Sequence, residues 1–138
     1  WLASPRVVAG TAVAIAVVGI VYATVLAQLW QPEGLFKVAD VTLHYVTPAL
    51  FVLWWLFFAR DGSAGWRALP LWLVYPLAYL AVAMTRGALT GEYPYPFLDL
   101  ATKSTAQVAA SCGVILALFL GVGAAIVMAD RLLPTPRH

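Results

Sequence analysis

Residues 104–129 read STAQVAASCGVILALFLGVGAAIVMA, which is 26 residues in succession without a charged side chain. A helix of about 20 apolar residues is long enough to cross the roughly 30 Å hydrocarbon core of a bilayer. Three further charge-free runs have comparable length, and they cover residues 7–32, 41–59 and 68–85. Because lipid leaves an open sheet without partners for its edges, we expect helices. The sequence therefore predicts an all-α polytopic bundle with four transmembrane spans, at about residues 7–31, 41–59, 67–86 and 104–129.

The composition points to the same class of protein. Of the 138 residues, 63% are hydrophobic and 10% are charged, and the net charge is +2. A soluble domain is about 25% charged, so this chain is expected to be neither a soluble enzyme nor a disordered linker. The net charge is also too small for the electrostatic footprint of a nucleic-acid binder. We expect residues 1–138 to form one transmembrane domain whose partners are membrane lipids and not nucleic acid.

Histidine and cysteine content limits the cofactors that this chain could hold. The single cysteine, Cys112, excludes an internal disulfide and a cysteine-rich metal site. Only one histidine, His44, lies in an expected span, so a haem held by two histidines of these spans is excluded. We therefore expect no metal and no cofactor.

Basic residues indicate how the spans are oriented. Four spans put both ends of the chain on one side, together with the connection around residues 60–67. That side carries five basic residues and the opposite side carries three, namely Arg6, Arg60, Arg67, Arg131 and Arg137 against Lys37, Arg86 and Lys103. The positive-inside rule then predicts cytoplasmic termini. Four tryptophans near the same side are expected to form an aromatic belt at the inner interface, namely Trp54, Trp55, Trp66 and Trp72.

The fourth span carries a small residue at every fourth position. These residues are Ala109, Gly113, Ala117, Gly121 and Ala125. Small side chains let a neighbouring helix approach closely. We expect this face to pack inside the bundle, and the alternative is a seam that contacts another membrane subunit.

His44 is the leading candidate for a site residue, because ionisable groups at membrane depth are costly and commonly functional. It is expected about one turn inside the second span, with Asp40 and Thr47 on the same helical face. A carboxylate one turn away can fix the tautomer of an imidazole and raise its basicity, which suits a general base. Pro48 removes a backbone donor and frees the carbonyl of His44. The alternative is a buried histidine that bonds to a neighbouring helix.

The connection from Arg86 to Lys103 is the longest in the chain, with 18 residues, and it contains EYPYPFLD at residues 92–99. Long connections in compact proteins are commonly functional. Polar residues gather at this end of the bundle, and they include Tyr22, Thr24, Arg86, Tyr93, Tyr95 and Asp99. Arg86, Tyr93, Tyr95 and Asp99 are therefore candidate supporting or substrate-binding residues of a small-ligand site. The connection could cover that site as a flap, or it could be an interfacial anchor.

Three motifs in order resemble the androgen-induced gene 1 family, and most closely its bacterial relatives. They are LHYVTP at residues 43–48, YPLAYL at 75–80 and TRGALTGEYPYPFLD at 85–99. The resemblance extends over about residues 19–99. It implies a bacterial membrane protein related to six-span hydrolases, which cleave fatty acid esters of hydroxy fatty acids with a threonine nucleophile and a histidine base. His44 stands at the position of that histidine.

The threonine of the family lies on an earlier helix, and no residue of this chain matches it. The resemblance therefore predicts that two N-terminal helices precede Trp1, and Thr24, Thr42 and Thr47 are not taken as substitutes. Two functions remain open. The first is a lipid-ester hydrolase with His44 as general base and its nucleophile outside this chain. The second is a non-catalytic accessory or lipid-binding subunit that docks on a larger membrane complex through its small-residue face.

Overall fold

The computed structural model describes residues 4–136, and all regular structure in this part of the chain is helical. Four helices in it are long and apolar enough to cross a membrane, namely Pro5–Leu26, Gly34–Ala59, Trp66–Thr90 and Thr105–Leu132. The predicted all-α bundle with four long apolar helices is thus confirmed. Arg137, one of the basic residues that indicate orientation, lies outside the described residues.

The first two long helices each change their winding along their length. Helix α1 (Pro5–Val21) continues as the π-helical segment η1 (Tyr22–Leu26). The second long helix consists of α2 (Gly34–Val41), the π-helical η2 (Thr42–Val46), α3 (Thr47–Trp54) and the π-helical η3 (Trp55–Ala59). The wider π turns are short insertions in α-helices that occur frequently at functional sites.

The third and fourth long helices are regular. A 3₁₀ turn, η4 (Trp66–Ala68), leads into α4 (Leu69–Thr90), which ends at Gly91 with φ of 74°. Glycine adopts this left-handed conformation without a steric penalty, so it terminates the helix. Helix α5 (Thr105–Leu132) begins at a capping box, in which Ser104 and Gln107 satisfy each other's backbone amides. The connection between α4 and α5 contains a second 3₁₀ turn, η5 (Pro96–Leu98).

Two helix boundaries differ from the sequence prediction. The first helix ends at Leu26 and not near residue 31, and the second begins at Gly34 and not at residue 41. The first turns of the second helix contain two charged residues, Lys37, which is exposed, and Asp40, whose carboxylate has partners inside the bundle. A count of charge-free runs leaves these turns out, so it places the start of the helix too late. As a result His44 lies about 15 Å along its helix, deeper than the one turn expected.

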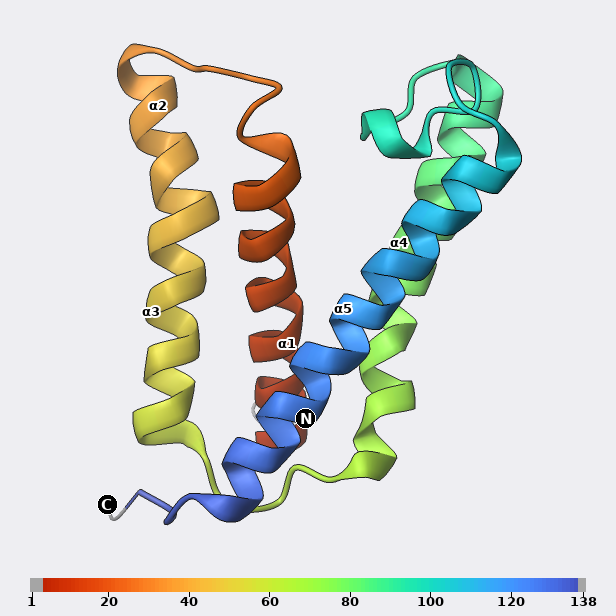
Figure 1. Cartoon of the computed structure of the whole chain (residues 1–138). Coiled ribbons are helices and arrows are strands. Elements are labelled where there is room, and N and C mark those ends of the chain that lie inside the picture. The colour runs from red at the N-terminus through yellow and green to blue at the C-terminus, as the bar shows by residue number, and fades with distance from the viewer. Residues whose placement is uncertain (1–3, 137–138) are drawn as a thin grey trace.

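The long helices form two hairpins, which are joined at one end of the bundle (Figure 1). The first hairpin is Pro5–Ala59 and the second is Trp66–Leu132. The joining segment, residues 60–65, lies at the terminal end of the bundle, which also holds both ends of the described chain. Residues 27–33 and 91–104 connect the helices at the opposite, loop end (Figure 1). Helix α1 contacts α3, α4 and α5, so it is the central helix of the bundle.

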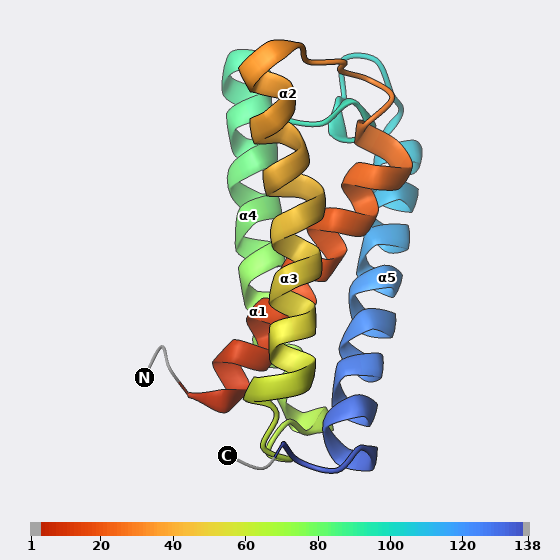
Figure 2. The same ribbon diagram turned by 90° about the vertical axis from the view of Figure 1, so that its left-hand side faces the viewer.

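The two hairpins lean apart toward the loop end (Figure 1). Figure 2, seen from the side of the first hairpin, shows that α1 runs obliquely behind α3. The larger hydrophobic core correspondingly joins the two hairpins and includes Val13 of α1, Trp55 of η3, Trp72 of α4 and Val127 of α5. A smaller cluster around Leu98 packs between α4, α5 and their connection. The bundle is thus packed tightly where the hairpins join and more openly near the loops.

The expectation of a tryptophan belt at the interface is wrong for two of its four members. Trp54 and Trp66 are about half exposed, whereas Trp55 and Trp72 are buried in the larger core. The indole Nε1 of Trp72 donates a hydrogen bond to the carbonyl of Arg6 at 2.9 Å. A buried indole finds a partner for its N–H in this way, so Trp72 ties the second hairpin to the start of the first.

The small-residue face of α5 points outward, and the expectation that it packs inside the bundle is wrong. Its five members are all exposed, namely Ala109, Gly113, Ala117, Gly121 and Ala125. A Cβ placed on Gly113 or Gly121 would meet no other atom within 4 Å. The close approaches are made by other glycines, because a Cβ on Gly10 would lie 2.4 Å from the Trp72 ring and one on Gly87 would lie 2.2 Å from the Tyr93 ring.

Arg60 and Asp130 form a polar cluster at the terminal end, which we call the terminal clamp. Both side chains are buried, at 8% and 2% exposure. The Arg60 guanidinium donates hydrogen bonds to the carbonyls of Leu56, Ala129, Leu133 and Pro134. The Asp130 carboxylate accepts from the amides of Gly62 at 3.2 Å and Ala64 at 2.8 Å. The clamp therefore satisfies the last carbonyls of α5 and fixes the segment that joins the hairpins.

Candidate functional site

An apolar cavity of about 280 Å³ lies between the two hairpins toward the loop end. Its walls come from α1, η1, η2, α4, α5 and η5, and most of its lining is aliphatic. Five lining residues carry polar or reactive atoms, namely Tyr22 and His44 of the first hairpin and Tyr79, Tyr95 and Cys112 of the second. A mainly apolar cavity with a few converging polar groups is the usual form of a small-ligand site.

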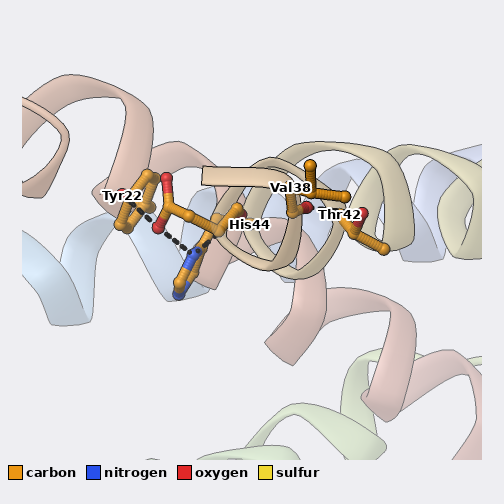
Figure 3. A network of polar contacts seen from close by, with 5 residues as sticks. Tyr22, Val38, Thr42 and His44 are labelled. Atoms are coloured by element: carbon orange, nitrogen blue, oxygen red, sulfur yellow. Dashed lines mark hydrogen bonds and ion pairs between the residues drawn. The ribbon is translucent and has the colours of Figure 1, made fainter. Parts of the chain in front are cut away.

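Tyr22, Asp40 and His44 form a connected group at the edge of this cavity (Figure 3). The Tyr22 hydroxyl donates to Oδ1 of Asp40 at 2.5 Å. Nδ1 of His44 lies 3.0 Å from the same oxygen and 3.1 Å from the Asp40 carbonyl. The imidazole also stacks on the Tyr22 ring, with centroids 3.8 Å apart and planes 7° apart. The contact between Asp40 and His44 that their spacing predicts is therefore present.

Wide helical turns carry both rings of this stack. Tyr22 begins η1 and His44 is the central residue of η2. Pro48 is the second residue after η2, and because it has no backbone N–H it cannot donate to the carbonyl of His44, which favours a wider turn there. The two hairpin helices come close at this point, since a Cβ on Gly19 would lie 3.1 Å from Pro48 and 3.4 Å from the His44 carbonyl. The sequence around Pro48 thus sets the local winding that presents His44 to Tyr22.

The contacts of Asp40 determine which ring nitrogen of His44 is free. Both acceptors near Nδ1 belong to Asp40, so Nδ1 carries the proton and donates. Nε2 is then the nitrogen with a free lone pair, and within residues 4–136 it has no hydrogen-bond partner. His44 lines the cavity and is 32% exposed. An imidazole oriented by a buried carboxylate in this way can accept a proton at Nε2.

Two tyrosines of the second hairpin that line the cavity are in contact with each other. The hydroxyl of Tyr79, in α4, lies 3.5 Å from that of Tyr95, in the connection before α5. The Tyr95 ring stacks on Phe97 with centroids 5.1 Å apart and planes 7° apart. Burial, followed by the contact with Tyr79, raises the pKa of Tyr95 to about 12. Tyr95 therefore stays a neutral phenol at any ordinary pH.

The other predicted site residues lie elsewhere. Arg86 is exposed and forms an ion pair with Glu92 at 2.8 Å. Thr47 is exposed and does not line the cavity. Tyr93 packs over Gly87 and outside the cavity lining. Asp99 accepts hydrogen bonds from the Ala101 amide and the Thr102 hydroxyl, so it shapes the turn before α5. Of the predicted set, the structure brings Asp40, His44 and Tyr95 to the cavity or its edge.

The hydroxyls of Thr42 and Thr24 are hydrogen-bonded within their own helices. Thr42 donates to the Val38 carbonyl at 2.7 Å (Figure 3), and Thr24 donates to the Ile20 carbonyl at 2.7 Å. Both side chains are exposed. Neither hydroxyl is hydrogen-bonded to His44.

Sequence reasoning missed Tyr79 and Cys112 as cavity residues and gave Tyr22 no specific role. Tyr22 and Asp40 are 18 positions apart, so no helical periodicity connects them. Tyr79 belongs to the YPLAYL motif, and this motif is the sequence signal that could have identified it as a candidate site residue. Within the described residues, no three His, Cys, Asp or Glu side chains come together as metal ligands.

Comparison of the chain with models of protein families, with curated proteins and with solved structures found no match. The function is therefore inferred from the geometry and chemistry of the cavity.

Proposed function

We propose that this protein is a membrane-embedded lipid-ester hydrolase in which His44 is the general base. One observation carries the proposal: an imidazole oriented by the buried Asp40 stands at the wall of an apolar cavity. The cavity lining suits an acyl chain, and Nε2 of His44 is available to take a proton. The resemblance of residues 19–99 to hydrolases of fatty acid esters of hydroxy fatty acids supports the same reaction and the same substrate class.

The surface of the bundle supports insertion into a bilayer. Large apolar side chains are exposed along all four long helices, with Leu35 at 86% and Leu89 at 81% exposure. Water-soluble proteins rarely expose contiguous apolar patches of this kind. Together with the positive-inside argument, this supports a location in the bacterial cytoplasmic membrane with both termini in the cytoplasm.

The reaction requires a hydroxyl nucleophile, because an ester carbonyl must be attacked while His44 takes the hydroxyl proton. Thr24 and Thr42 donate to their own helices, which argues against them as nucleophiles. We assign the nucleophile to a threonine on a segment outside this chain, as the resemblance implies. That segment would bring its hydroxyl to Nε2 of His44.

The test compares three variants of the full-length protein in native membranes. His44→Gln and Asp40→Asn are expected to lower hydrolysis of a fatty acid ester of a hydroxy fatty acid by about 10²- to 10⁴-fold, the usual contribution of an oriented base. Glu33→Gln, an exposed carboxylate of the same hairpin, is the control and should keep full activity. Product fatty acid is measured by mass spectrometry. Undiminished hydrolysis by a folded His44→Gln variant would contradict the proposal.

A non-catalytic accessory subunit is the second candidate, and the outward small-residue face of α5 favours it. A helix of another membrane subunit could approach this face closely. If so, Gly113→Leu together with Gly121→Leu should release the protein from its complex, seen as a lower mass in mild detergent. Val114→Leu, at a neighbouring exposed position, should leave that mass unchanged. An unchanged mass for the double variant would exclude docking through this face.

A further inference from the structure

The hydroxyl groups of two cavity-lining tyrosines, which come from separate elements, lie close to each other. The Tyr79 hydroxyl comes from α4 and the Tyr95 hydroxyl from the connection that covers the loop end. Both residues line the same cavity as His44, and both belong to the second hairpin, whereas His44 belongs to the first. A ligand that fills the cavity would therefore contact side chains of both hairpins, with His44 on one and the two tyrosines on the other.

The spacing of the two hydroxyls suits the binding of one further oxygen atom. Their oxygens are 3.5 Å apart, which is long for a hydrogen bond between hydroxyls, whose usual length is about 2.7–2.8 Å. An oxygen atom placed about 2.8 Å from each would complete a triangle on this base. Both O–H groups could then donate to it, and the mutual contact would be replaced by two shorter bonds.

We propose that the hydroxyls of Tyr79 and Tyr95 form the oxyanion-binding site for the ester carbonyl, and this inference rests on the proposed hydrolase function. In the reaction, the nucleophilic hydroxyl oxygen bonds to the carbonyl carbon while its proton passes to Nε2 of His44. The π electrons of the carbonyl move onto its oxygen, and the resulting oxyanion accepts the two hydrogen bonds. When the tetrahedral intermediate collapses, the carbon–oxygen bond to the alcohol breaks and the alcohol oxygen takes the proton from His44. The acyl group stays on the nucleophile until a water molecule, which gives its proton to Nε2 of His44, attacks the acyl carbon and releases the fatty acid.

The two donors are held in place before a ligand arrives. Tyr95 stands between Pro94 and Pro96, which restrict the backbone on both sides. Its ring stacks on Phe97, and the neighbouring Leu98 is buried at 3% exposure and anchors the turn. The raised pKa of Tyr95 keeps its proton available for donation. Donors that need no rearrangement stabilise a developing negative charge most effectively.

The experiment measures ester hydrolysis by full-length Tyr79→Phe, Tyr95→Phe and the double variant in native membranes. Losing one oxyanion donor lowers kcat by about 100-fold or more, and we expect this loss for each single variant with little change in KM. Affinity for a long-chain alkyl trifluoromethyl ketone, which forms a tetrahedral adduct, should fall in parallel with kcat. Tyr75→Phe is the matched control, because Tyr75 lies on α4, is 70% exposed and does not line the cavity.

The outcomes separate this inference from the proposed function. If the wild type cleaves the ester and His44→Gln does not, but both tyrosine variants keep normal kcat, the oxyanion site is wrong and the hydrolase stands. A rise in KM alone, or loss of activity only through unfolding in a thermal melt, would also overturn it. If the wild type cleaves no ester, the hydrolase and the oxyanion site are rejected together.

Discussion

Asp40 is the residue on which the candidate site depends. A carboxylate in an apolar helix is costly unless it has partners, and Asp40 has two, the hydroxyl of Tyr22 and Nδ1 of His44. Spacing along the helix is enough to predict the second contact, since residues 40 and 44 are one turn apart. The first contact crosses between two helices, and only the folded hairpin reveals it.

Replacing Tyr22 with phenylalanine tests this contact between the two helices. Tyr22→Phe keeps the stacked ring but removes the donor to Asp40, so we expect the free energy of unfolding to fall by about 1.5–3 kcal/mol, the usual value for a hydrogen bond to a charged group. It is measured by denaturant titration in detergent micelles.

Tyr45→Phe is the matched control for that substitution. Tyr45 packs edge-on against Tyr22 with ring centroids 5.6 Å apart, and it is exposed. Its substitution is expected to change the free energy of unfolding by less than about 0.5 kcal/mol. Equal losses in the two variants would mean that the bond to Asp40 contributes nothing specific.

Arg86 and Asp99 show why counting the polar residues at one end of a bundle overestimates how many of them belong to a site. Both lie near the loop end as predicted, but each finds a partner close in sequence, Glu92 for Arg86 and the Ala101 amide for Asp99. A side chain that is paired with a neighbour in sequence is less available to a ligand site shared with other helices. Tyr95 reaches the cavity because its two flanking prolines extend the backbone and Phe97 supports its ring.

At the scale of helices, the number of long apolar helices followed from charge-free runs, but their bounds and winding did not. Charge counting begins the second helix after Asp40, although the helix starts at Gly34 and includes that residue. The π-helical segments η1 and η2 leave no clear periodic signal either, and the one local signal is Pro48, the second residue after η2. The residues that give the site its geometry therefore lie where simple sequence rules are weakest.

The spacing of small residues in α5 identified a face correctly but assigned it to the wrong environment. Periodicity shows which residues lie together and does not show what lies opposite them. The glycines at which a Cβ would lie closer than 3.0 Å to another side chain are Gly10, Gly87 and Gly123, and none of them belongs to the small-residue face of α5.

Paired glycine substitutions test which helix faces are packed. Gly10→Ala would force a methyl group against the Trp72 ring, which is buried and held by its bond to the Arg6 carbonyl. We expect a loss of about 1–3 kcal/mol in the free energy of unfolding, as for other overpacked sites. Gly113→Ala, with open space around it, should be neutral or stabilising by up to about 1 kcal/mol from helix propensity. Denaturant titration in micelles distinguishes the two, and a larger loss for Gly113→Ala would contradict the packing described here.

At the scale of the whole molecule, the cavity exists because the two hairpins separate toward the loop end. Its volume of about 280 Å³ corresponds to about nine water molecules at a liquid volume of about 30 Å³ each. A methylene group is similar in size to water, so this volume would be enough for one segment of the acyl chain in the proposed substrate. Cys112 lines the cavity on α5 and is the only cysteine of the chain.

Labelling of Cys112 reports occupancy of the cavity independently of catalysis. A non-hydrolysable ether analogue of a long-chain ester, at ten times its dissociation constant, should slow the reaction of Cys112 with N-ethylmaleimide about tenfold. Val114→Cys in a Cys112→Ser background is the control, because position 114 is 69% exposed on the same helix and should react at the same rate with and without the analogue. Labelling of Cys112 that ignores the analogue would mean that the cavity does not hold an acyl chain.

The terminal clamp has a mechanical consequence for the cavity. Arg60 and Asp130 fasten the segment that joins the hairpins, whereas residues 27–33 and 91–104 each connect helices of the same hairpin. The two hairpins are therefore covalently joined only at the terminal clamp, and this end would act as the hinge of any motion between them. A rotation of about 5° over an arm of roughly 30 Å would widen the free end by about 3 Å. In the proposed hydrolase, such opening would admit a lipid from the side and draw His44 away from Tyr79 and Tyr95. Closure would then bring the proposed base and the proposed oxyanion donors together around the substrate.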